Sequence, residues 1–204
     1  MTSRLDGDCT PKGLSLVGDA ARFVELATPI ELLANEVGVV NVFDDGGYRT
    51  AILLKLFGLT KNPGRLGHDA QDADGNLYEL KTVNLIDTRG KPKKSIPSIT
   101  TEHSLTLANI SRYRATKAWL VGVFEGHVPL DVWVIDSEKL EPFYAAWEEK
   151  IRRLISEGKG DHDNNPKIPF GYVQEAGRCF NIAAPEGRRE VRIAKWRPLK
   201  SSDV

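Results

Sequence analysis

Three side chains in the stretch 67–81 are of the types that metal-dependent hydrolysis needs. Asp69 precedes an Asp74-Gly75 pair, and Glu79 and Lys81 follow it. Asp-Gly between two alternating segments is a strong signal for a β-hairpin. Because side chains alternate along a strand, Glu79 and Lys81 share one face of the second strand.

The length of the turn decides which face Asp69 occupies. With a two-residue turn at Asp74-Gly75, Asp69 would point away from Glu79. With a three-residue loop, 73–75, whose last glycine is left-handed, Asp69 falls opposite Glu79 instead. This second loop is a common hairpin type, and it gathers Asp69, Glu79 and Lys81 into one cluster.

Such a cluster has a defined chemistry. Two converging carboxylates repel each other unless a cation lies between them, and oxygen ligands suit Mg²⁺. The carbonyl of Leu80 offers a further oxygen, and a lysine beside the metal can orient or deprotonate a water. We therefore predict that Asp69, Glu79 and Lys81 are catalytic and that Asp69, Glu79 and Leu80 bind Mg²⁺. Taken alone, the pattern also fits solvated charges with a weak cross-strand pair.

The surroundings of the cluster resemble the PvuII-like family of type II restriction endonucleases, in the PD-(D/E)XK nuclease superfamily. The similarity runs over about residues 35 to 182 and joins several separated motifs in order. The matching segments are 62–70 (NPGRLGHDA), 78–84 (YELKTVN), 45–47 (DGG), 143–148 (with Phe143, Tyr144, Trp147 and Glu148) and 163–169 (DNNPKIP).

The resemblance implies a restriction-endonuclease-like mixed β-sheet flanked by helices, and the order of expected elements gives the same α/β class. The chain, 1–204, is expected to be one nuclease domain. Residues 13–38 would be N-terminal helices at a dimer interface, 39–182 the catalytic and DNA-recognition core, and 183–204 a basic tail. The family further implies a homodimer that cuts short palindromic double-stranded DNA, leaving blunt ends with 5′-phosphates, beside a cognate DNA methyltransferase.

Candidate DNA contacts come from two segments. Amides read adenine in the major groove, which makes Asn164-Asn165 candidates. Where the family has three histidines, this chain has Glu102-His103-Ser104; glutamate can accept from cytosine and serine can contact several bases. These departures predict a target that differs from the family's at one or more positions. Asp45, Thr100 and Tyr113 are added to these two segments, so the full predicted set is Asp45, Thr100, Glu102, His103, Ser104, Tyr113, Asn164 and Asn165.

Composition describes an ordinary globular chain, with 41% hydrophobic and 27% charged residues. The formal net charge is zero, but bases are concentrated between 88 and 117, where a local basic surface can contact phosphates. Cys9 and Cys179 are far apart and are expected to be free thiols. No apolar run has membrane-spanning length and no signal peptide is visible, so we expect a cytoplasmic protein.

The coarse element pattern is as follows. A short helix is expected from Asp19, and a second from the Thr28-Pro29-Ile30-Glu31 capping box to about Val37. Residues 85–99 form a basic loop that is longer than in the family. The remaining expectations are helices at 48–57, 110–117 and 137–157 and buried strands at 118–124 and 128–135.

Two other functions remain open. A DNA-repair or modification-dependent nuclease is favoured by the altered Glu102-His103-Ser104 segment. A non-catalytic DNA-binding protein on the same fold is disfavoured by the intact Asp69, Glu79 and Lys81.

Overall fold

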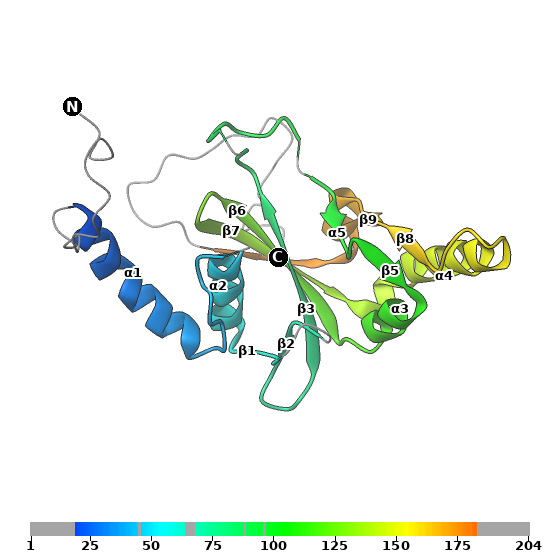
Figure 1. The fold of residues 1–204 in the computed structure, drawn as a ribbon, viewed down its shortest axis with the longest axis horizontal. Helices are drawn as coiled ribbons and strands as arrows, with labels where there is room; N and C mark the ends of the chain where they lie inside the picture. The colour runs from blue at the N-terminus through cyan, green and yellow to red at the C-terminus, as the bar shows by residue number, and fades with distance from the viewer. Residues whose placement is uncertain (1–18, 45, 64–67, 88, 96, 183–204) are drawn as a thin grey trace, which may run out of the picture.

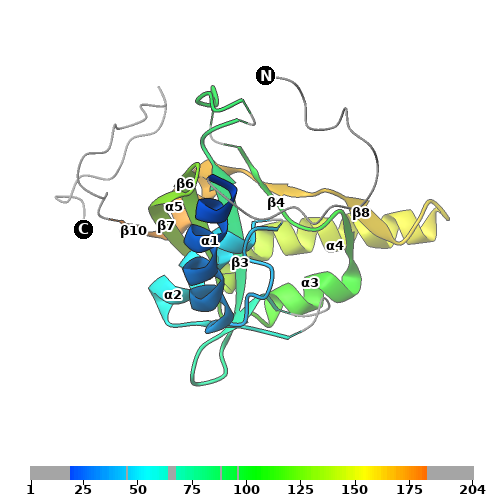
Figure 2. The same ribbon diagram turned by 60° about the vertical axis from the view of Figure 1, so that its left-hand side comes forward.

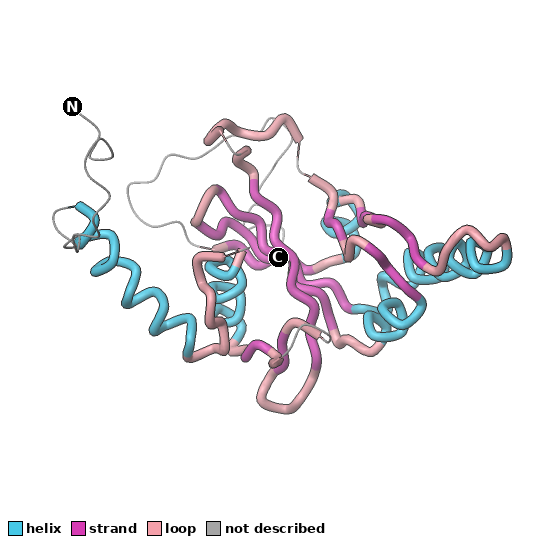
Figure 3. The backbone as a smooth tube through the Cα atoms, in the orientation of Figure 1, coloured by secondary structure: helices cyan, strands magenta, loops and turns pink. Residues whose placement is uncertain are grey.

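The computed structural model describes residues 19–44, 46–63, 68–87, 89–95 and 97–182. These residues form a six-stranded mixed sheet with helices on both faces, as Figures 1 and 3 show. The predicted α/β class and restriction-endonuclease-like architecture are confirmed.

The sheet has the strand order β1-β2-β3-β6-β7-β10. Its central pair, β3 with β6, is parallel, and the other neighbouring pairs are antiparallel. Strand β6 is a nearly continuous apolar run, as expected for a strand covered on both faces. The bounds are Thr60–Lys61 (β1), Ala70–Gln71 (β2), Leu77–Asn84 (β3), Ala118–Glu125 (β6), Val128–Asp136 (β7) and Arg178–Asn181 (β10).

The described residues contain five α-helices: α2 covers one face of the sheet, α3, α4 and α5 lie on the other, and α1 lies outside α2 (Figures 1 and 2). Helix α2 ends at Gly58, whose φ of 62° gives the expected left-handed cap. Helix α3 begins earlier than predicted, because Thr106 and Asn109 form a capping box at its start. A 3₁₀ turn, Ser137–Leu140, precedes α4. The bounds are Asp19–Asn35 (α1), Gly47–Phe57 (α2), Leu107–Arg114 (α3), Glu141–Ser156 (α4) and Phe170–Ala176 (α5).

The sheet separates two hydrophobic cores. Trp119 and Val121 of β6 belong to the core beneath α3, α4 and α5, whereas Leu120 belongs to the core beneath α1 and α2. Leu80 of β3 also lies in the second core. Because side chains alternate along a strand, the neighbours of Leu80 face α3 and α4.

Two short strand pairs lie outside the main sheet. Strand β4 (Ile99–Thr100) pairs with β9 (Lys167–Ile168), and β5 (Ser104–Thr106) pairs with β8 (His162–Asn164). Their inward side chains, Ile99, Leu105 and Ile168, join the core beneath α3 and α4. These pairings attach two chain segments, far apart in the sequence, to the same side of the molecule.

The two N-terminal helices expected from the sequence are one helix in the structure. Helix α1 continues through Pro29, so the prediction of a helix start at Thr28 is wrong. The Thr28 hydroxyl donates backward to the carbonyl of Val24 at 2.9 Å instead of capping the residues ahead of it. A threonine inside a helix can bond to the preceding turn in this way.

Among the helices of the described residues, none is both long and apolar enough to cross a membrane. The predicted basic tail, 183–204, lies outside the described residues.

Candidate active site and DNA-reading surface

The hairpin between β2 and β3 has the predicted three-residue loop. Ala70 lies opposite Tyr78, and the N–H of Asp72 donates to the carbonyl of Asn76 at 3.1 Å. Gly75 has a φ of 80°, in the left-handed region that glycine adopts without strain. Continued by one residue, this register places Asp69 opposite Glu79.

Asp72 holds the loop in this geometry. Its carboxylate accepts hydrogen bonds from the main chain of Asp74 and Asn76, from the Asn76 amide and from the Tyr78 hydroxyl, at 2.8–3.0 Å. These bonds, first of all that from the Asn76 side chain, lower the pKa of Asp72 to about 2. The sequence analysis did not single out Asp72, although an aspartate at the start of a turn is a recognisable signal.

Glu79 and Lys81 form a buried ion pair on the face of β3 that looks toward α3. Glu79 is only 4% exposed, and its Oε1 lies 2.8 Å from Lys81 Nζ. The ammonium group also lies 5.6 Å from the centre of the Trp119 ring, which is opposite Glu79 in the register of β3 and β6. Burial raises the pKa of Glu79 to about 7, against the opposing effect of Lys81. Burial lowers the pKa of Lys81, but the charges of Glu79 and Asp69 outweigh it, so the net shift is upward.

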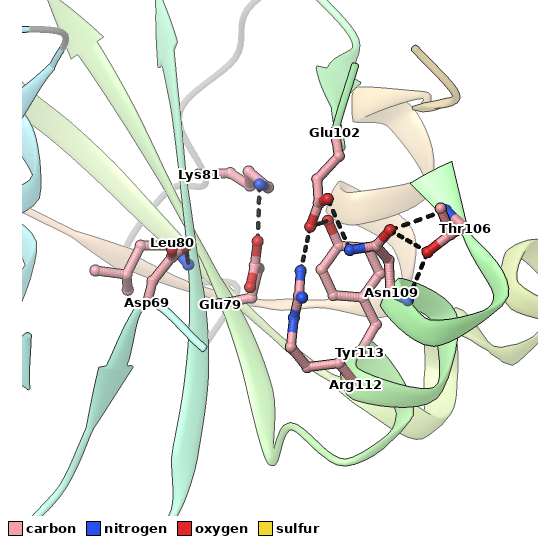
Figure 4. Close-up of polar contacts among 9 residues, drawn as sticks. All are labelled: Asp69, Glu79, Leu80, Lys81, Glu102, Thr106, Asn109, Arg112 and Tyr113. Atoms are coloured by element: carbon pink, nitrogen blue, oxygen red, sulfur yellow. Dashed lines mark hydrogen bonds and ion pairs between the residues drawn. The ribbon is translucent and has the colours of Figure 1, made fainter. Parts of the chain in front are cut away.

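Asp69 lies just before the first residue of β2 and reaches across to β3. Its Oδ2 accepts the main-chain N–H of Leu80 at 2.8 Å (Figure 4). The N–H and C=O of one strand residue point to the same side, so the Leu80 carbonyl also faces Asp69. The negative charge of Asp69 raises the pKa values of both Glu79 and Lys81, which places the three groups in one electrostatic cluster.

A second group of predicted residues is gathered on the two short strand pairs. Ser104 lies opposite Asn164, Thr100 lies opposite Lys167, and the N–H of Asn165 donates to the carbonyl of His103 at 3.0 Å. The side chains of these predicted residues are exposed. We call this group the reading surface; it comprises Thr100, His103, Ser104, Asn164 and Asn165.

The segment that carries Asn164 and Asn165 is held in place by α4 and by its own backbone conformation. Asp163, which is 6% exposed, pairs with Lys150 of α4 at 2.5 Å. Asn165 has a φ of 48°, a left-handed conformation that asparagine tolerates better than most residues. Asn165 therefore bends the chain directly after β8, which ends at Asn164, and both asparagines are exposed.

Comparison with known proteins identifies the family. The family model for restriction endonuclease PvuII matches residues 20–180. This chain belongs to the PvuII restriction endonuclease family. Family membership makes it a DNA-binding nuclease of the type II restriction endonucleases. The matched residues include the Asp69–Lys81 cluster and the whole reading surface.

The donor set of this restriction endonuclease fits a hard divalent cation. Asp69, Glu79 and the Leu80 carbonyl offer oxygen ligands only, which is the preference of Mg²⁺. Among the described residues, no three His, Cys, Asp or Glu side chains are close enough together to hold a metal ion. A metal ion bound at this position would therefore have two carboxylates and one main-chain carbonyl as its protein ligands. In this structure the ammonium group of Lys81 pairs with Glu79.

Three predicted DNA contacts of the endonuclease have a different outcome. Tyr113 is fully buried and its hydroxyl donates to Glu102, so its contact with DNA stays a prediction that this buried position does not support. The Glu102 carboxylate turns toward α3 and accepts from Asn109, Arg112 and Tyr113, so it does not face the reading surface. The sequence could not reveal this, because the three donors lie on a helix that begins several residues later. Asp45 lies outside the described residues.

Proposed function

We propose that this restriction endonuclease uses Mg²⁺ to hydrolyse both strands of a short palindromic duplex, leaving blunt ends with 5′-phosphates. The observation that supports this most is that Asp69, Glu79 and Lys81 cluster at β3. The exposed amides Asn164 and Asn165 belong to a surface on the same side of the main sheet. Chemistry and base recognition are thus supplied by one face of the molecule.

In the proposed mechanism Asp69, Glu79 and the carbonyl of Leu80 hold the metal. When bound, Mg²⁺ supplies Lewis acidity toward the scissile phosphate. With Glu79 engaged as a metal ligand, Lys81 would be released from the ion pair that it makes with this carboxylate here. The freed ammonium donates to the attacking water and offsets the charge that develops on the phosphate. The water oxygen bonds to phosphorus as the bond to the 3′ oxygen breaks in line. The proton of the attacking water passes to solvent and the 3′ oxygen takes a proton from solvent, so the phosphate stays on the 5′ end.

We further propose that the functional unit is a homodimer joined through α1. Helix α1 exposes Val24, Leu26, Leu32 and Leu33, which are between 50% and 62% accessible. At the helical spacing these side chains point to different sides of α1, and several exposed apolar side chains on one helix favour burial against a partner. A two-fold dimer would present two active sites to a two-fold symmetric DNA site, as a palindrome requires.

A restriction endonuclease of this kind requires protection of the host's own sites. We therefore propose that the enzyme acts in the cytoplasm beside a DNA methyltransferase of the same specificity.

The test is a plasmid digest with purified protein, with and without Mg²⁺, on methylated and unmethylated DNA, followed by sequencing of the cut ends. We expect discrete, blunt, metal-dependent cuts at one palindrome, blocked by methylation of that palindrome. Cleavage of methylated plasmid alone would identify a modification-dependent nuclease. Duplex binding without cleavage in any divalent metal would leave a DNA-binding protein and refute the proposal.

A further inference from the structure

The carboxylate of Glu102 is the centre of a polar cluster beside the active site. Its Oε2 accepts from the Asn109 amide at 2.8 Å, and its Oε1 accepts from the Tyr113 hydroxyl at 3.2 Å and from Arg112 (Figure 4). All three donors belong to α3. Both carboxylate oxygens are therefore occupied by one helix.

The main chain on both sides of Glu102 is hydrogen-bonded to the segment 165–166, next to Asn164. On one side, the N–H of Thr101 donates to the carbonyl of Pro166 at 3.2 Å. On the other side, His103 accepts from the N–H of Asn165 at 3.0 Å. Glu102, in the loop between β4 and β5, thus lies between two hydrogen bonds that join this loop to the segment that holds the exposed amides. Displacement of this segment would displace Glu102.

The donors on α3 lead to the catalytic pair. The Tyr113 ring packs edge-on against Trp119, with ring centres 4.8 Å apart, and Trp119 lies beside Glu79 and Lys81. Figure 4 shows the Arg112 guanidinium between the Glu79 and Glu102 carboxylates. Positive and negative groups therefore alternate from Lys81 through Glu79 and Arg112 to Glu102.

This alternation leaves Arg112 with two possible partners. Its Nη2 is bonded to Glu102, whereas its buried Nε has no hydrogen-bond partner among the described residues. A partly buried guanidinium that lost Glu102 would be left without its carboxylate, which is costly. Glu79 would then be the neighbouring carboxylate for it to pair with. Such a pair would occupy the oxygens that a metal needs.

We propose that Glu102 is a positioning residue that keeps Arg112 away from Glu79. Because Glu102 is fixed to the reading surface, this arrangement depends on how the reading surface docks on DNA. The inference rests on the proposed function. DNA that seats the reading surface leaves Glu102 in place and Glu79 open to the cation. A wrong sequence that displaces residues 100–104 withdraws Glu102, and Arg112 then closes the site by pairing with Glu79.

The test compares Glu102→Gln with Arg112→Gln and with the double variant. Glu141→Gln is the matched control, because Glu141 pairs with Arg114 of the same helix at 2.7 Å on an exposed side. Metal affinity is measured by calorimetry with Mg²⁺ or Mn²⁺ alone, without DNA. Affinity for the enzyme's own site is measured without metal, and cleavage is measured under single-turnover conditions.

We expect Glu102→Gln to weaken metal binding and slow cleavage by about tenfold, a size typical of coupling between contacting residues. Metal-free affinity for the site should change by less than about twofold. The double variant should recover metal affinity, because the competing guanidinium is gone. A merely structural role for Glu102 would give no such rescue, and Glu141→Gln should match the wild type in every measurement. If Glu102→Gln does not fold, Glu102→Asp, whose shorter side chain reaches Arg112 poorly, is expected to give the same pattern.

The inference would be overturned if Glu102→Gln had unchanged metal affinity, or if the double variant bound metal no better than Glu102→Gln. Cleavage by the wild-type protein would still support the proposed function in that case. A changed base preference with normal metal binding would make Glu102 a base reader and would also overturn it. A wild-type protein that neither bound metal nor cut DNA would refute the proposed function, and this inference with it.

Discussion

Asn165 donates its main-chain N–H to the carbonyl of His103 at 3.0 Å, which joins two distant segments into one reading surface. The bond uses the backbone of Asn165 and leaves its amide side chain exposed. The side chain can therefore be changed without breaking the link.

We expect Asn165→Gly to weaken binding to the enzyme's own site by about 1–3 kcal/mol, the size of one bidentate amide–adenine contact. Binding to random duplex should change little, because phosphate contacts are independent of sequence. Glycine is the appropriate substitution, since alanine would add strain at a φ of 48°. Gel-shift titration of both duplexes with Ca²⁺ in place of Mg²⁺ measures the difference; equal losses on the two would return Asn165 to a purely structural turn.

Asp69→Asn tests the metal site with little disturbance of the fold. The amide oxygen can still accept the Leu80 N–H, but the charge is lost. We expect the cleavage rate to fall by about a hundredfold or more, while affinity for the DNA target in the presence of Ca²⁺ is retained. Asp74→Asn, in the exposed loop of the same hairpin, is the control and should cut normally. Near-normal cleavage by Asp69→Asn would show that Asp69 is not a ligand of the catalytic metal.

Local signals predicted the hairpin well. The Asp74-Gly75 pair and the alternation around Glu79 require no information from the rest of the chain, and the loop has the predicted length. The same local reasoning failed at Thr28, where a helix-start pattern lies inside one continuous helix. There the sequence signal for a cap competes with backward bonding by the threonine hydroxyl, and residue types alone do not decide between them.

The sequence did not predict those parts of the candidate site that depend on pairing between distant segments of the chain. The amides at 164 and 165 and the segment 102–104 were each predicted to contact DNA, but nothing in the sequence places Ser104 opposite Asn164. The direction of Glu102 was equally inaccessible, because it depends on donors that α3 brings to it. The predicted change of target therefore rests on Ser104 and the surrounding segment, and no longer on a direct contact from Glu102.

The ionisation of Glu79 predicts a pH dependence of stability in the metal-free protein. The folded pKa of about 7 is above the ordinary value of 4.5, so the folded state binds more protons between these pH values. Stability contributed by this group is therefore present at low pH and is lost as the pH rises through the folded pKa. From about pH 5 to about pH 8, Glu79→Gln should gain roughly 1–3 kcal/mol relative to the wild type. Urea unfolding at both pH values measures this, and a constant difference would contradict it.

The exposed face of α1 gives the last prediction. Leu32 is 62% exposed, so replacing it removes little packing within the subunit. If this face joins two subunits, Leu32→Lys places a charge in an apolar interface and should raise the dimer dissociation constant at least about tenfold.

Ile155→Lys is the matched control, since Ile155 is 48% exposed on α4, away from α1. Light scattering over a dilution series reports the assembly state, and a supercoiled plasmid reports whether one strand or both are cut. We expect Leu32→Lys to be a monomer that mainly nicks the plasmid, while Ile155→Lys remains dimeric and linearises it. A Leu32→Lys protein that stayed dimeric and cut both strands would place the subunit interface elsewhere.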